Sequence, residues 1–216
     1  MSITAPIVTY SRHRMMIDGN GITTLVIFHN CPLRCKYCAN PYTIESQTKT
    51  HLFTPQELFD KVKIDNLYFL ATNGGITFGG GEPLLYPDFI SEFHDICPDA
   101  WSINIETSLS IPFANIEKTA ELVDMFYIDC KDSNPQIYKE YTGKDNSLMI
   151  ENIKKLLCII PSEKITLKLP LIPGYNTKED VENSREFFKA LGVTQFFDLT
   201  YLTPDQIHKE TKQETV

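Results

Sequence analysis

Apolar and polar positions alternate along six short segments of the chain, and longer stretches with helical spacing separate these segments. The alternating, β-rich segments are residues 23–29, 75–78, 101–107, 125–130, 164–169 and 194–202. Helices are expected between them, one beginning at residue 54 and others at residues 87–96, 112–123, 134–141, 148–160 and 177–191, with Ser147 as a cap of the fifth. The clearest begins at Thr54, where Pro55 in the first turn and Glu57 at the third position form a capping-box pattern. Gly192 is expected to end the last helix.

This strand–helix alternation predicts an α/β fold, in which helices cover a parallel sheet. Six units are fewer than a closed eight-stranded barrel requires, so we expect a partial (β/α)6 barrel in a single domain. The domain is expected over residues 1–216, with a core at about residues 17–203 and a short solvated C-terminal tail. A doubly wound open sheet is the alternative, because strand order does not follow from one sequence.

Side chains on three predicted strands divide into an apolar and a polar face, since residues two apart share a face. The apolar sets are Ile103 and Ile105; Phe126, Ile128 and Cys130; and Ile165, Leu167 and Leu169. The polar sets are Asn104, Glu106 and Ser108; Tyr127, Asp129 and Lys131; and Lys164, Thr166 and Lys168. We expect the apolar faces to meet the helices and the polar faces to surround a ligand inside the barrel. An antiparallel sheet with one wet face would show the same alternation, but the intervening helices make it the weaker interpretation.

Composition narrows the class of protein. The chain has 216 residues, of which 42% are hydrophobic and 22% charged, and a net charge of −8. This balance argues against a nucleic-acid or anionic-membrane surface. We see no signal peptide and no apolar stretch long enough to span a bilayer, so a cytoplasmic location is expected. Three of the six cysteines are scattered, and Cys130 and Cys158 are expected to be buried.

The other three cysteines, Cys31, Cys35 and Cys38, lie within eight positions after the first predicted strand. Three thiolates form a soft metal site that is one ligand short of a tetrahedral zinc or a cubane cluster. A glycine motif, residues 79–83, follows the second predicted strand. Glycine lets a backbone approach a ligand closely. Both motifs are expected at the carboxyl ends of the strands, where α/β folds bind ligands.

The C-x3-C-x2-C spacing, with Tyr37 before the last cysteine and the glycine motif downstream, resembles the radical S-adenosylmethionine (SAM) superfamily. Further segments are similar to the glycyl-radical-enzyme activating enzymes of the pyruvate formate-lyase activating type. They are residues 17–22, 38–40, 107–108, 129–131 and 173–175. The resemblance covers most of the chain. It departs from the usual pattern at Asn20 and Thr23, where relatives usually carry Pro and Arg, and in the absence of a histidine near Leu202.

The resemblance implies one [4Fe–4S] cluster, held by Cys31, Cys35 and Cys38, with SAM chelating the fourth iron through its amino and carboxylate groups. One-electron reduction of SAM would give methionine and a 5′-deoxyadenosyl radical that abstracts hydrogen. The implied partners are a glycyl radical enzyme, which supplies the glycine, and a flavodoxin- or ferredoxin-type reductant.

The resemblance also implies roles for individual residues. The cofactor-binding set would be Tyr37, Gly80, Gly81, Glu82, Glu106, Thr107, Ser108, Asp129, Lys131 and Lys168. Glu106 and Asp129 would also be candidates for a monovalent cation, and Lys168 would be a counter-charge for the carboxylate of SAM. Mutual ion pairing of Glu106, Asp129 and Lys168 is the structural alternative.

Two other functions remain open. A radical SAM enzyme could act on a small molecule, such as a deazapurine precursor, or on a peptide. A non-catalytic zinc module would need a fourth ligand, for which His29 is the candidate.

Overall fold

The computed structural model describes residues 3–16, 18–203 and 206, and over these residues the chain forms one eight-stranded sheet. The strands are β1 Ala5–Met15, β2 Ile22–Phe28, β3 His51–Phe53, β4 Gly75–Gly80, β5 Ser102–Thr107, β6 Met125–Asp129, β7 Ile165–Leu171 and β8 Gln195–Thr200. Their order across the sheet is β3-β1-β2-β4-β5-β6-β7-β8. From β2 to β8 neighbouring strands pair in parallel, whereas β1 pairs antiparallel with both β2 and β3.

This order decides between the two folds that the sequence allowed. The six parallel strands follow one another in chain order, whereas the strand order of a doubly wound sheet reverses at a switch point. Among the described residues β8 pairs only with β7, so the barrel does not close. The partial barrel is therefore confirmed. All six predicted strands are present, with ends shifted by up to two residues.

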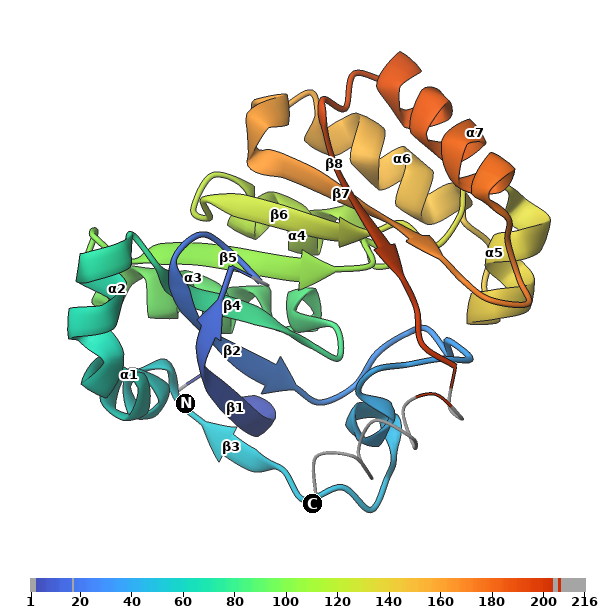
Figure 1. Cartoon of the computed structure of the whole chain (residues 1–216). Coiled ribbons are helices and arrows are strands. Elements are labelled where there is room, and N and C mark those ends of the chain that lie inside the picture. The colour runs from blue at the N-terminus through green and yellow to red at the C-terminus, as the bar shows by residue number, and fades with distance from the viewer. Residues whose placement is uncertain (1–2, 17, 204–205, 207–216) are drawn as a thin grey trace.

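The α-helices are α1 Pro55–Val62, α2 Asn66–Thr72, α3 Pro87–Ile96, α4 Phe113–Ala120, α5 Pro135–Thr142, α6 Ser147–Leu156 and α7 Lys178–Ala190. Short 3-10 turns are Pro41–Ile44, Lys63–Asp65, Pro83–Leu85 and Ser162–Lys164. Figure 1 shows α3, α4, α6 and α7 along the outer side of the curved sheet. No helix in the described part of the chain has the length and apolar character needed to cross a membrane.

Local signals explain where most helices begin. The side chain of Thr54 accepts from the Glu57 backbone and Glu57 caps Thr54 in return, as the sequence predicts. Gly192, at φ +105°, follows the end of α7. The predicted cap at Ser147 is wrong, because Ser147 is already the first residue of α6 and Asn146 holds the cap position.

The core lies between the sheet and the helices. The predicted apolar faces of β5, β6 and β7 are buried there, and Cys130 is fully buried among them, as expected. The prediction for Cys158 is wrong, because its side chain is exposed. Helix α6 ends at Leu156, so Cys158 falls in the following turn, where its Sγ donates to the Lys154 carbonyl. The predicted tail, residues 205–216, lies outside the described residues except for residue 206.

Candidate functional site

A cavity of about 420 Å³ opens at the carboxyl ends of the parallel strands. The predicted site residues that line it are Cys31, Cys35, Cys38, Tyr37, Gly80, Gly81, Glu106, Thr107, Ser108, Asp129, Lys131 and Lys168. Ala39 and Asn40, from the similar segment 38–40, also line it, and residues to which the sequence analysis gave no role complete the wall: Leu33, Tyr141, Leu199, Thr200, Tyr201 and Leu202. The fold thus gathers the cysteines, the glycine motif and the polar strand ends around one space.

The cysteine loop, residues 31–38, is fixed by the C-terminal end of α5. The backbone N–H of Arg34 donates to the Thr142 carbonyl at 2.9 Å, and the N–H of Lys36 donates to the Tyr141 carbonyl at 3.1 Å. The Arg34 guanidinium also donates to the Cys31 and Leu33 carbonyls, each at 2.7 Å. These bonds hold a loop without regular secondary structure in one shape beside the cavity.

The thiols of this loop are partly buried. Burial raises the pKa of the Cys31 thiol to about 12, with a further contribution from the negative charge of Glu82. Burial likewise raises the pKa of Cys35 to about 11, although Lys131 opposes the rise. A metal centre bound here would displace these protons, since thiolates are the ligands.

The donor set suits a cluster better than a single ion. In the described residues, no three His, Cys, Asp or Glu side chains are grouped closely enough to hold one metal ion. A cubane cluster does not need that grouping, because each thiolate binds a different iron. His29, the candidate fourth ligand for zinc, instead places its Nε2 3.2 Å from the Glu45 carbonyl oxygen. The residues present therefore fit a [4Fe–4S] cluster with one iron lacking a protein ligand.

The glycine motif brings the end of β4 against the start of the cysteine loop. Gly80 has φ +89°, and a Cβ built at Gly81 would lie 2.3 Å from the Asn30 carbonyl oxygen. The Gly81 N–H donates to the Phe28 carbonyl at 3.1 Å, and the Glu82 N–H donates to the Asn30 carbonyl at 2.7 Å. A side chain at Gly81 would disrupt this contact. Because neither glycine carries a side chain, the backbone of Gly80 and Gly81 faces the cavity directly.

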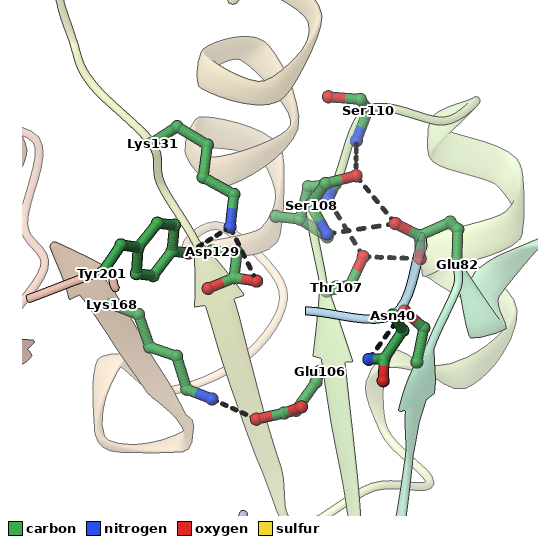
Figure 2. A network of polar contacts seen from close by, with 12 residues as sticks. Asn40, Glu82, Glu106, Thr107, Ser108, Ser110, Asp129, Lys131, Lys168 and Tyr201 are labelled. Atoms are coloured by element: carbon green, nitrogen blue, oxygen red, sulfur yellow. Dashed lines mark hydrogen bonds and ion pairs between the residues drawn. The ribbon is translucent and has the colours of Figure 1, made fainter. Parts of the chain in front are cut away.

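Glu82 has a different place from its neighbours, because it is fully buried behind the cavity wall. Its carboxylate accepts from the Thr107 hydroxyl at 2.7 Å and from the Ser108 hydroxyl and N–H at 2.8 and 3.0 Å (Figure 2). It also accepts from the Leu84 N–H at 3.3 Å. Burial raises the pKa of Glu82, although these hydrogen bonds oppose the rise. Glu82 thus positions two residues that line the cavity.

Two lysine–carboxylate pairs form the charged wall of the cavity, as Figure 2 shows. Lys168 on β7 pairs with Glu106 on β5. Lys131 lies 2.9 Å from Asp129 and donates to the Tyr201 hydroxyl at 2.6 Å. Mutual ion pairing of Glu106, Asp129 and Lys168 was the structural alternative. Lys168 and Glu106 do form such a pair, whereas Asp129 pairs with Lys131.

The two carboxylates differ in their proton affinity. Burial raises the pKa of Glu106, and Lys168 only partly offsets this effect. Burial acts on Asp129 in the same direction, but the charges of Lys131 and Lys168 outweigh it and lower its pKa. Asp129 is thus held ionised beside Lys131.

Aromatic rings cluster at one side of the cavity. Tyr37 packs edge-on against Tyr141 and Tyr175, with ring centroids 6.0 and 5.6 Å apart. Tyr201 follows β8, near the position where relatives were expected to carry a histidine. Tyr141 and Tyr201 were missed because neither belongs to a motif, although the end of the sixth predicted strand did mark the place of Tyr201.

Comparisons with known proteins give a consistent result. The model of the Radical SAM superfamily matches residues 25–188. The pyruvate formate-lyase-activating enzyme of Clostridium pasteurianum is 35% identical over 82% of this chain and 73% of its own length. The indoleacetate decarboxylase activating enzyme of Tractidigestivibacter scatoligenes is 26% identical over 87% of this chain and 85% of its own.

A solved structure supports the fold. SuiB of Streptococcus suis, bound to S-adenosylmethionine, superimposes with a TM-score of 0.64 at 13% sequence identity. The match covers 86% of this chain and 44% of SuiB, so this chain corresponds to less than half of that protein. At this identity the likeness concerns the fold alone.

Proposed function

The chain belongs to the radical SAM superfamily, and from this premise we propose that it is an activating enzyme that generates a glycyl radical on a partner enzyme. Its relatives include several activating enzymes of glycyl radical enzymes. Membership of the family implies a [4Fe–4S] cluster and SAM as cofactors. When bound, they supply one electron and a carbon–sulfur bond, whose cleavage gives methionine and a 5′-deoxyadenosyl radical able to take hydrogen from glycine.

The observation that carries the proposal is the shared cavity. Three thiolates from the cysteine loop would hold three irons, and the fourth iron would accept SAM. The exposed backbone around Gly80 and Gly81 would accept the ammonium group of SAM. Lys131 or Lys168 would balance the negative charge of the SAM carboxylate. To do so, Lys131 would loosen its ion pair with Asp129, or Lys168 its pair with Glu106.

The remaining wall would orient the nucleoside. Tyr37 would lie against the adenine, and the hydroxyls of Thr107 and Ser108 would bond to the ribose or carboxylate, held in place by Glu82. A monovalent cation between Glu106 and Asp129 would have to displace the lysines that now pair with them. The chain's own contribution is binding, orientation and exclusion of water.

The open barrel supports a macromolecular substrate. Because β8 has a free edge in the described chain, the cavity is not enclosed by a complete ring of strands. A protein loop carrying the target glycine would enter through this gap. A flavodoxin- or ferredoxin-type protein would supply the electron.

Anaerobic reconstitution tests the proposal. The reduced protein is incubated with SAM, and 5′-deoxyadenosine is quantified with and without the glycyl radical enzyme encoded nearest to its gene. We expect 5′-deoxyadenosine in both and a glycyl radical signal by electron paramagnetic resonance only with the partner. If a protein fully loaded with cluster forms no 5′-deoxyadenosine, the proposed SAM cleavage is refuted. Cleavage without a glycyl radical on any candidate would favour a small-molecule or peptide substrate.

A further inference from the structure

The hydroxyl of Tyr141 is the unusual polar group of the cavity. Tyr141 lines the cavity and is fully buried, yet its hydroxyl has no hydrogen-bond partner within the described residues. A buried hydroxyl without a partner costs about 1–3 kcal/mol relative to a satisfied one. Such a group in a ligand cavity points to an acceptor that the bare polypeptide does not supply.

The backbone places Tyr141 in a fixed relation to the cysteine loop. Its carbonyl accepts from the Lys36 N–H at 3.1 Å, one bond of the pair that anchors this loop to α5. Its ring packs edge-on against Tyr175, with centroids 5.1 Å apart. The ring therefore cannot turn to solvent without breaking the packing beside the cysteines.

The neighbours of the hydroxyl narrow the choice of acceptor. Burial raises the pKa of Tyr141, and the groups that act on its hydroxyl are Lys131, Tyr201, Cys35 and the backbone N–H of Tyr37. Lys131 and the Tyr37 N–H can only donate. The Tyr201 oxygen already accepts from Lys131 and, like the thiol of Cys35, makes no hydrogen bond with the Tyr141 hydroxyl. A cluster held by Cys35 would bring sulfur with substantial negative charge into this part of the cavity.

We propose that Tyr141 donates a hydrogen bond to sulfur at the corner of the cluster held by Cys35 and thereby raises the reduction potential of the cluster. The proposal rests on the proposed function, because it requires the cluster. Hydrogen bonds to sulfur help to set the potential of iron–sulfur clusters. Reduction adds negative charge, so a donor stabilises the reduced state more than the oxidised state. Tyr141 acts here as a positioning and tuning residue.

The test compares Tyr141→Phe with Tyr138→Phe as a matched control. Tyr138 lies one turn earlier on α5 and is also fully buried, but its hydroxyl is 2.9 Å from the Ser110 hydroxyl. The potential of the reconstituted, SAM-free protein is measured by redox titration followed by electron paramagnetic resonance. We expect Tyr141→Phe to lower the equilibrium constant for one-electron reduction about tenfold, a shift of ~59 mV to more negative potential. Tyr138→Phe should leave the potential unchanged.

Stability gives a second readout. In the cluster-free protein, Tyr141→Phe should unfold at the same or a higher denaturant concentration, because it removes an unpartnered hydroxyl. Tyr138→Phe should unfold earlier, because the Ser110 hydroxyl loses its partner. If the Phe variant does not load a cluster, 3,5-difluorotyrosine at position 141 replaces it. This more acidic phenol is a stronger donor and should shift the potential to less negative values.

The outcomes separate the two claims. An unchanged potential in a fully loaded Tyr141→Phe variant overturns the role of Tyr141 while the cluster stands. Weaker SAM binding with an unchanged potential also overturns it, because the hydroxyl would then serve SAM. A wild-type protein that loads no cluster overturns the proposed function and the role of Tyr141 with it.

Discussion

Removing the carboxylate of Glu82 should weaken the fold and the cofactor site together. In Glu82→Gln one carboxylate oxygen is replaced by an amide NH2 group, which donates hydrogen bonds and cannot accept them. The least costly orientation turns this amide toward the Thr107 hydroxyl, which can rotate to accept, and leaves the Leu84 N–H unpaired. One buried N–H without an acceptor costs about 1–3 kcal/mol. The lower part of this range is expected, because the bond to Leu84 is long, at 3.3 Å, and the amide avoids burying a charge.

Glu82→Ala should cost more, because the N–H groups of both Leu84 and Ser108 lose their acceptor, at about 2–6 kcal/mol in total. Urea unfolding of the metal-free, reduced protein measures both variants by linear extrapolation. The control is Asp88→Asn, which removes an exposed pair with Lys118 and should cost about 0–1 kcal/mol. Equal stability of Glu82→Ala and wild type would mean that the buried hydrogen bonds of Glu82 do not stabilise the fold.

The same carboxylate predicts a pH dependence. The native state raises the pKa of Glu82 and so holds its proton more tightly than the unfolded chain. Wild-type stability should therefore fall as pH rises from the ordinary glutamate range toward the raised pKa. Glu82→Gln should lack this part of the slope. An identical slope in both proteins would mean that burial does not control the carboxylate.

Other perturbations test separate parts of the structure. Replacing any one of the three cluster cysteines with Ala should abolish 5′-deoxyadenosine formation, whereas Cys130→Ala, on the helix side of β6, should leave cleavage largely intact; a chromatographic assay distinguishes these results. Lys168→Met should cost about 1–3 kcal/mol in urea unfolding, because it leaves the partly buried carboxylate of Glu106 without its partner, and stability within error of wild type would contradict a contribution from this pair. Burial raises the pKa of Asp65, but bonds from Arg12 and Thr24 outweigh it and lower the pKa. The stability that ionised Asp65 contributes should be lost as pH falls below the ordinary aspartate range. In Asp65→Asn the free energy of unfolding should depend less on pH over this acidic range.

The strands predicted correctly are those in which burial of one face produces an alternation of apolar and polar residues. Strands β5, β6 and β7 have one face against helices and one toward the cavity, so their alternation is visible in the sequence. Strand β1 was missed because it lies outside the parallel sheet core and carries Arg12, His13 and Arg14 in succession. Its pairing with β2 also contains register shifts, and His13 has φ +58°. Tertiary pairing rather than local pattern makes this segment a strand.

The site shows the same division. Residues at the carboxyl ends of predicted strands, such as Thr107 and Asp129, could be placed because parallel strands end at one edge of the sheet. Tyr141 could not, since it reaches the cavity from a helix and only through the anchoring of the cysteine loop to α5. The sequence also placed Glu82 with the cofactor contacts. It could not indicate that the carboxylate turns toward Thr107 and Ser108 and away from the cavity.

The most direct test of the account is whether an iron of the cluster binds SAM. The reconstituted, reduced protein is mixed with SAM labelled in its amino nitrogen and carboxylate oxygen, and electron–nuclear double resonance measures coupling to the cluster. We expect coupling to both labels and an iron content of about four atoms per chain. Absence of coupling in a fully loaded protein, or tight loading with zinc in place of iron, would contradict it.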